Sequence, residues 1–157
     1  LDGRLYRGSV GTAGELGHVT LDARGSLCRC GNRGCVELSA GGRALLAQAR
    51  LSHASLKDLD ELASLAAAGD PGCRRLLADS GRHLGFALGG LLNLINPDRI
   101  IVGGFNFEPE LLLEPIQRGL AETAMAAAVD AVEVVTASLG ERASALGGVA
   151  LALGVDL

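Results

Sequence analysis

The stretch that decides the fold is Asn96-Pro97-Asp98-Arg99-Ile100-Ile101-Val102-Gly103-Gly104. Its run of β-branched residues predicts a strand, and such continuous runs are typical of a strand that is covered on both faces. The glycine pair stands at the carboxyl end of that strand, where open α/β sheets bind ligands and where glycine would let a nucleotide approach the backbone. A tight turn explains the pair equally well, and the lysine of a phosphate-binding Walker loop does not follow it.

The segments after this strand continue the pattern. We expect a helix at 109–127, a second strand at 132–135 and a final helix at 144–153. The order from residue 99 onward is therefore β-α-β-α. This order predicts a layered α/β domain with a partly parallel sheet.

The longest helix is expected just before the strand, from Asp70-Pro71 to about Ile95, because Pro71 suits a first helical position and Pro97 ends the helix. Three of its glycines fall four residues apart on one face: Gly81, Gly85 and Gly89. Each glycine costs a helix about 1 kcal/mol relative to alanine. This face is therefore expected to meet another backbone closely, and a ligand lying along the groove is the alternative.

Shorter elements are expected earlier in the chain: strands at 3–8 and 17–21, and helices at 36–50 and 56–68. Gly41-Gly42 should interrupt the first of these helices softly. Ser55 is the expected N-cap of the second, because its hydroxyl can accept a hydrogen bond from the first turn.

The composition limits the class of protein. The chain has 157 residues, 48% hydrophobic but only 3% aromatic, so Leu, Ala, Val and Ile must build the core. A net charge of −4 argues against general electrostatic binding of nucleic acid by this segment. We find neither a signal peptide nor an apolar run long enough for a membrane, which indicates a cytoplasmic protein. Because the first residue is Leu1, we expect a piece of a longer protein.

Three of the four cysteines fall within eight residues, in Cys28-Arg29-Cys30-Gly31-Asn32-Arg33-Gly34-Cys35, and His18 precedes them by ten residues. Three thiolates and one imidazole complete the tetrahedral shell of a structural zinc ion. Gly31 and Gly34 suit the tight turns that such a loop needs. The predicted ligands are therefore His18, Cys28, Cys30 and Cys35. Their spacing is not that of a zinc finger, so this element implies no contact with DNA.

The cysteine cluster is also compatible with two arrangements that hold no metal. A disulfide would leave one of three thiols over, and the chain lacks the cysteine density of a small secreted scaffold. Reduced, buried thiols are the second alternative. The fourth ligand could instead be Cys73, His53 or His83, although Cys73 at a helix start is also typical of a small core residue.

Glu15 and Glu37 lie on either side of the predicted metal loop. Carboxylates accept paired hydrogen bonds from adjacent hydroxyls, so two glutamates held by a rigid site could bind a sugar diol. Each could equally be a solvated surface charge. Glu37 could also stabilise the start of the helix near Val36 through the helix dipole.

Three motifs together resemble the ROK family, a name that covers bacterial repressors, open reading frames of unknown role and sugar kinases. They are Gly14-Glu15-Leu16-Gly17-His18, Cys28-x-Cys30-Gly31-x-x-Gly34-Cys35-x-Glu37 and Asn96-Pro97-x-x-Ile100-Ile101-Val102-Gly103-Gly104. The resemblance extends over nearly the whole chain, and the cysteine block with its histidine is highly specific. It implies an actin-like, ribonuclease-H-like fold with two lobes around a cleft. Residues 1–157 would be most of the C-terminal lobe, without the N-terminal lobe or any DNA-binding domain.

The resemblance also implies roles for single residues. Zinc would be held by His18, Cys28, Cys30 and Cys35. Glu15, His18 and Glu37 would face a sugar, with the zinc fixing the loop of Glu37 relative to Glu15. In the family's kinases, Gly103 and Gly104 would lie against ATP, which binds with Mg²⁺. Because the catalytic aspartate of those kinases comes from the N-terminal lobe, we expect no catalytic residue in this chain.

Two departures from the kinase pattern favour a sugar-responsive transcriptional regulator over a glucokinase-like sugar kinase. Family kinases carry an Asn-Asp-Ala-Gly-like run before the final helix, where residues 140–147 here read Gly-Glu-Arg-Ala-Ser-Ala-Leu-Gly. Phe105-Asn106 replaces the kinases' usual third glycine. The expected partners are a sugar or sugar derivative, operator DNA through a domain outside this chain, and further copies in a homodimer or homotetramer. A zinc-stiffened oligomerisation domain without a ligand is the remaining alternative.

Overall fold

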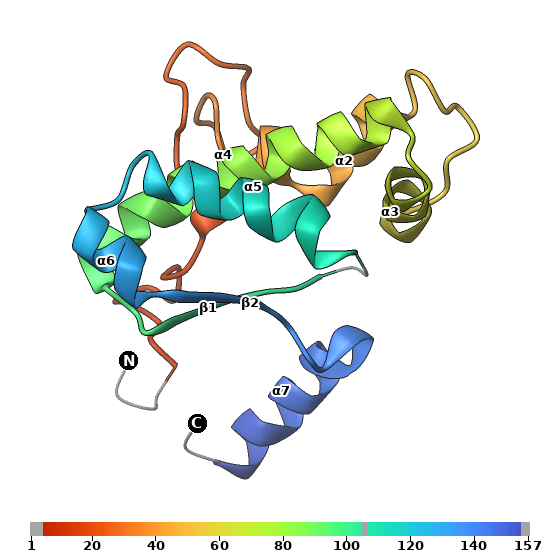
Figure 1. Cartoon of the computed structure of the whole chain (residues 1–157). Coiled ribbons are helices and arrows are strands. Elements are labelled where there is room, and N and C mark those ends of the chain that lie inside the picture. Colours follow the sequence, from red (N-terminus) through yellow and green to blue (C-terminus); the bar gives the residue numbers. More distant parts are fainter. Residues whose placement is uncertain (1–4, 105–106, 155–157) are drawn as a thin grey trace.

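The computed structural model describes residues 5–104 and 107–154, and its two strands form a parallel pair (Figure 1). Strand β1 (Arg99–Val102) pairs with β2 (Glu133–Thr136), with Arg99 opposite Glu133 and Val102 opposite Thr136. The connection runs through α5 (Pro109–Ala121) and α6 (Ala126–Ala131), and α7 (Ala143–Leu153) follows β2. The predicted β-α-β-α order and the parallel pairing are confirmed.

The expected helix at 109–127 is wrong in one respect, because the chain breaks into two helices between Ala121 and Ala126. The side chain of Asn93 fills this break. Its amide donates to the carbonyl of Thr123 at 3.1 Å, and its oxygen accepts the backbone N–H of Met125 at 2.9 Å. Asn93 thus pairs the backbone groups that an uninterrupted helix would have paired itself.

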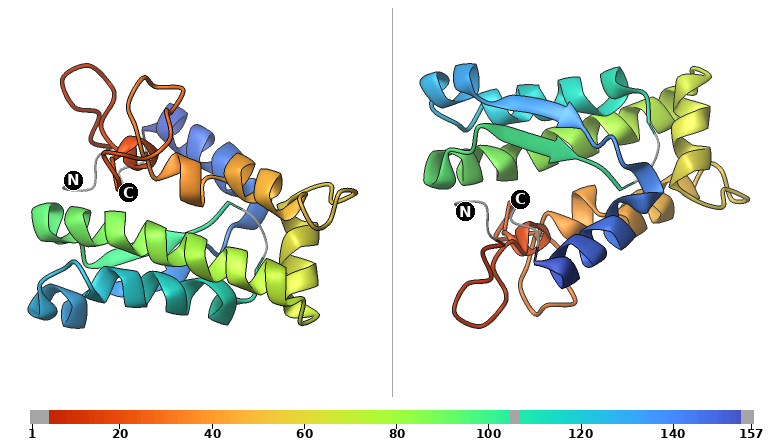
Figure 2. Two further views of the ribbon diagram at one scale, coloured as in Figure 1. Left: turned by 90° about the horizontal axis from the view of Figure 1, so that it is seen from above. Right: turned by 90° about the horizontal axis from the view of Figure 1, so that it is seen from below.

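Helix α4 (Pro71–Ile95) is the longest helix in the described part of the chain and packs along α5 (Figure 2). A Cβ at Gly81 would lie 2.8 Å from the Cβ of Pro115, and one at Gly85 would overlap the carbonyl oxygen of Ile116. The expected close approach of another backbone is therefore confirmed. The helix ends as predicted, because Asn96 takes a left-handed conformation (φ 49°) directly before Pro97.

Three shorter helices surround the first half of α4: α1 (Glu37–Ala40), α2 (Gly42–Ala49) and α3 (Leu59–Ala67). The break at Gly41 is confirmed. The predicted cap Ser55 is wrong, since α3 begins at Leu59 and the carboxylate of Asp58 accepts the N–H of Glu61 at 2.9 Å. These helices enclose a first core of buried side chains: Leu45, Ala49, Leu56, Leu62, Ala66, Cys73 and Leu77.

The two early strands do not form in the described residues. Residues 5–8 lie in no strand, and residues 3–4 of that prediction lie outside the described residues. At 17–21 the chain instead forms the 3₁₀ helix η1 (Leu16–His18), and only Thr20 makes a bridge, to Cys35. The backbone of residues 19–22 pairs with Gly34 and Val36 at the end of the cysteine loop, and this pairing is too short to make a strand.

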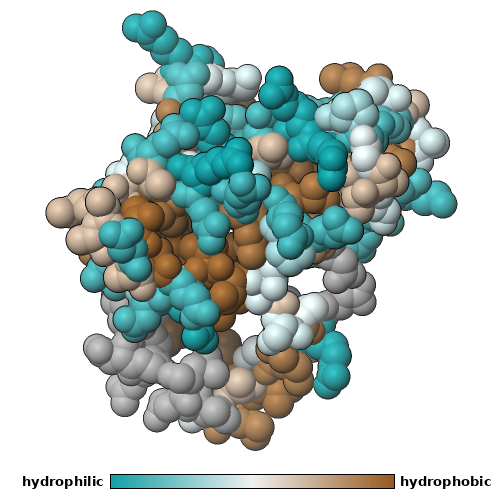
Figure 3. Space-filling model, viewed as in Figure 1, coloured by the Kyte–Doolittle hydropathy of each residue, from teal (hydrophilic) through white to brown (hydrophobic). Residues whose placement is uncertain are grey.

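The sheet is covered on one face rather than on two. Ile100 and Val102 are buried toward α4 and α5, where they join a second core, whereas Ile101 is 64% exposed. Helix α7 lies beyond the carboxyl ends of the strands and leaves apolar side chains exposed at the lower edge of Figure 3. The expectation of cover on both faces is therefore wrong for this chain, because α4 and α5 pack on the same side.

Candidate metal centre and neighbouring carboxylates

The four predicted ligands come together although they spread from residue 18 to residue 35. One ligand atom from each lies within 4.8 Å of the others. The Sγ of Cys28 lies 3.8 Å from Nδ1 of His18, and the Sγ of Cys30 lies 3.6 Å from that of Cys35. A tetrahedral zinc ion with ordinary Zn–N and Zn–S bonds would separate neighbouring ligand atoms by about 3.6 to 3.8 Å. The geometry is therefore compatible with a bound metal ion.

Glycines shape the loop that carries the cysteines. Gly31 (φ 94°) and Gly34 (φ 59°) both take the left-handed backbone that side chains disfavour. A Cβ at Gly34 would also overlap the carbonyl group of Asp22. Asn32 lies between the two glycines, and its carbonyl accepts the N–H of Cys28 at 2.7 Å, which closes the turn. The tight turns that the sequence predicted are confirmed.

The thiols are free, and their surroundings differ. The 3.6 Å between Cys30 and Cys35 is far beyond the roughly 2.05 Å of a disulfide. Burial raises the pKa of Cys35 to about 12, whereas a hydrogen bond from the backbone N–H of Asn32 lowers the pKa of Cys30. A divalent cation would replace the protons of such thiols on binding. The disulfide alternative is thus not realised in this fold.

The competing fourth ligands lie elsewhere. His53 and Cys73 belong to a separate cluster at the start of α4. His83 is exposed on α4 and joins neither cluster in the described part of the chain. By position, His18 is therefore the residue that completes the set of three thiols.

The residues predicted to face a sugar also come together, beside the cysteine cluster. Nε2 of His18 lies 4.0 Å from a carboxylate oxygen of Glu15, while Nδ1 of the same ring faces Cys28. A Cβ built on Gly17 would lie 3.1 Å from the carboxylate of Glu37, so this side chain lies against η1. The side chains of Glu15 and Glu37 are 66% and 33% exposed, which leaves both open to a ligand.

Arg29 adds a positive charge to this site, although no sequence motif singled it out. Its guanidinium lies 3.7 Å from the carboxylate of Glu37. Its position between two predicted metal ligands, Cys28 and Cys30, could have indicated that Arg29 lies at the site. Glu37 is also the first residue of α1, so a stabilising interaction of this glutamate with the helix dipole stays compatible with the structure.

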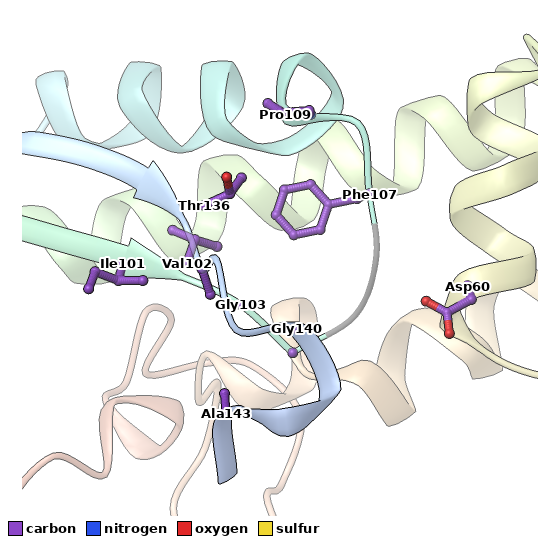
Figure 4. Close-up of a pocket in the computed structure, with 11 residues that line it drawn as sticks. Asp60, Ile101, Val102, Gly103, Phe107, Pro109, Thr136, Gly140 and Ala143 are labelled. Atoms are coloured by element: carbon purple, nitrogen blue, oxygen red, sulfur yellow. The ribbon is translucent and has the colours of Figure 1, made fainter. Parts of the chain in front are cut away.

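A cavity of about 420 Å³ opens at the carboxyl ends of β1 and β2 (Figure 4). Gly103 and Gly104 line it, and Gly104 has a φ of 126° that favours glycine, so the pair both turns the chain and borders a cavity. Asp60 contributes the single charged side chain, and no Lys or Arg lines the cavity among the described residues. The predicted contact of the glycine pair with a nucleotide stays a prediction.

Nearly the whole sequence matches a known protein family. The model of the ROK family matches residues 1–155. The chain belongs to the ROK family. Among curated relatives, the xylose repressor of Bacillus spizizenii is 37% identical over 150 residues, which are 94% of this chain and 38% of the repressor.

Two solved ROK structures share the mixed α/β fold. One is a ROK family transcriptional regulator described as a homologue of the E. coli MLC protein, with a TM-score of 0.78, 32% identity, and coverage of 87% of this chain and 37% of that chain. The other is a ROK hexokinase from Thermus thermophilus, with a TM-score of 0.72 and 37% identity over 92% of this chain and 48% of that chain. The chain thus spans less than half the length of these ROK proteins. In its described residues we find no helix long and apolar enough to cross a membrane.

Proposed function

We propose that this chain is the sugar-sensing part of a ROK transcriptional regulator and carries a structural zinc site. The observation that carries the proposal is the grouping of Glu15, His18 and Glu37 directly beside the cysteine cluster. The similarity to the xylose repressor and to a solved ROK regulator supports the choice of a regulator. In this proposal the chain is one lobe of a longer, cytoplasmic protein that binds operator DNA through another domain.

Zinc would be held by His18 Nδ1 and by the thiolates of Cys28, Cys30 and Cys35. Four protein ligands leave no position for water, so the ion supplies fixed geometry and charge rather than catalysis. Because Cys35 lies two residues before Glu37 and His18 lies three after Glu15, the ion would fix the two carboxylates relative to each other. Nε2 of His18 stays free to face the ligand.

The ligand would be a sugar or sugar derivative. Two exposed carboxylates offer several acceptors to neighbouring hydroxyls, and charge-assisted hydrogen bonds are the stronger kind. With Nδ1 of His18 on the metal, its Nε2–H would donate a hydrogen bond to a sugar oxygen. The Arg29 guanidinium beside Glu37 would hold that carboxylate in place. A sugar that binds one arrangement of the lobes better than another shifts their equilibrium, and a homodimer or homotetramer would pass the shift to the DNA-binding domains.

A sugar kinase is the second candidate, and its support is the 37% identity to a ROK hexokinase. ATP and Mg²⁺ would then use the cavity at Gly103 and Gly104. Residues 140–147 depart from the run that family kinases carry before the final helix, which favours the regulator. The other departure, at Phe105-Asn106, lies outside the described residues.

The deciding experiment uses the full-length protein that contains this chain, with a panel of pentoses and hexoses. We measure sugar-dependent operator binding and ATP-dependent phosphorylation for the parent, for Glu37→Gln and for the control Glu122→Gln. Glu122 is an exposed glutamate that pairs with Arg82 and does not belong to the cysteine cluster. We expect Glu37→Gln alone to lose the sugar response while it keeps its zinc. A normal response in Glu37→Gln would refute the sugar site, and turnover of ATP by the parent would establish the kinase.

A further inference from the structure

A second cluster of metal-binding side chains lies at the start of α4. His53 comes from the loop between α2 and α3, Asp70 is the N-cap of α4, and Cys73 lies in its first turn. One ligand atom from each of the three lies within 4.8 Å of the others. The cluster thus joins two segments that lie 17 residues apart, from 53 to 70, and no sequence motif links them.

Asp70 divides its two carboxylate oxygens between two tasks. Oδ1 accepts the backbone N–H of Cys73 at 2.8 Å and caps the helix, which fixes the carboxylate in place. Oδ2 lies 3.2 Å from Nε2 of His53. A tetrahedral zinc ion would hold nitrogen and oxygen ligands about 3.3 to 3.4 Å apart. The spacing of this nitrogen and oxygen therefore suits a bound ion, and Sγ of Cys73 lies within 4.8 Å of a ligand atom of each residue.

The protein's own side chains leave one polar atom of this cluster unsatisfied. Nδ1 of His53 is buried and has no hydrogen-bond partner among the described residues, while Nε2 faces Asp70. Whether Nδ1 carries a proton or a lone pair, it stays unpaired, and a buried polar group without a partner is destabilising. Cys73 is only 1% exposed, and burial raises the pKa of its thiol to about 11. The donor atoms of the cluster are therefore Nε2 of His53, the carboxylate of Asp70, which the helix cap holds in place, and the buried thiol of Cys73.

We propose that His53, Asp70 and Cys73 form a second metal site, which takes zinc or a similar transition-metal dication. One nitrogen, one oxygen and one sulfur donor suit such an ion, whereas Ca²⁺ and Mg²⁺ take oxygen ligands. The side chains of His53 and Asp70 are 28% and 27% exposed, so the ion has a way in and a fourth position open to water.

The bound ion would tie the loop between α2 and α3 to the start of α4. Arg50 already stabilises this loop, because its guanidinium donates hydrogen bonds to the carbonyls of Leu56 and Lys57 at 2.8 Å each. The ion would add a cross-link at the other side of the same loop, where His53 lies. This proposal is independent of the sugar response, because the cluster shares no residue with the carboxylates and cysteines around His18.

The test counts metal ions on the whole chain. The metal-free protein is titrated with Zn²⁺ and analysed by native mass spectrometry, and with Co²⁺ to record the absorption bands of each site. We expect the parent to bind two equivalents, and His53→Ala and Cys73→Ala to bind one each. The matched control is His83→Ala, an exposed histidine on α4, which should still bind two.

The proposal is refuted if His53→Ala binds as many equivalents of Zn²⁺ as the parent at saturation, whether that number is one or two. Because His53 is partly exposed, its replacement tests the site even if Cys73→Ala weakens the core. Circular dichroism of each variant checks the fold. If the cysteine loop binds no ion, the parent binds one equivalent and His53→Ala binds none, so failure of the first site is distinguishable from failure of the second.

Discussion

Replacing Gly85 by alanine tests the close packing of α4 on α5, which positions β1 and the cavity at its end. A Cβ at Gly85 would overlap the carbonyl oxygen of Ile116 and lie 2.8 Å from the nitrogen of Leu120 and 2.9 Å from Cα of Gly119. All three are backbone atoms, so no flexible side chain can move aside. Gly90, on the same helix, is exposed and has nothing within 4 Å of its Cβ position.

Because of these contacts, replacing glycine by alanine should destabilise the protein at residue 85 and stabilise it at residue 90. Overpacking a core typically costs about 1 to 3 kcal/mol, and a backbone clash belongs at the upper end. Alanine returns about 1 kcal/mol of helix propensity, so Gly85→Ala should lower the free energy of unfolding by about 2 kcal/mol. Gly90→Ala meets no atom and should raise it by about 0.5 to 1 kcal/mol. The two variants should therefore differ by about 3 kcal/mol.

Urea unfolding of the zinc-loaded chain, followed by circular dichroism, measures the difference. With a slope of about 2 kcal/mol per molar urea, the two midpoints should lie about 1.5 M apart, with the parent between them. Equal midpoints, or a Gly85→Ala variant as stable as the parent, would refute the argument. That result would mean that the two helices do not approach as closely as these distances require.

Three further outcomes follow from single contacts. Asn93→Ala removes both hydrogen bonds across the break between α5 and α6 and should cost about 1 to 2 kcal/mol in thermal unfolding, and a change near zero would contradict its role there. Asp58→Ala should cost about 1 kcal/mol of unfolding free energy as the lost N-cap of α3, whereas Ser55→Ala should cost almost nothing, and the reverse order would restore the cap expected from the sequence. Chelation of the metal should lower the melting temperature and speed proteolysis within residues 19–36, with both restored by Zn²⁺, and an unchanged digestion pattern would speak against a structural ion.

Local and chemical signals determined much of this protein from the sequence alone. Pro71 and Asn96-Pro97 set the limits of α4 correctly, because proline acts on its own neighbours whatever the tertiary structure. The order of strands and helices after residue 99 followed from hydrophobic pattern. The grouping of His18 with the cysteines was predictable because three thiols so close in sequence have few alternatives, and the motifs sufficed for the ROK family.

Only the tertiary structure decided the features that join distant segments. The break between α5 and α6 depends on Asn93, about 30 residues earlier in the chain, and the second cluster joins His53 to Asp70 across α3. The exposed face of β1 depends on which side α4 and α5 pack, which the β-branched run of the strand does not encode. The physical reason is the same in these cases. Whether a residue is buried or paired depends on the residues that surround it in space. A sequence pattern predicts those surroundings only where the residues that are close in space are also close in the chain.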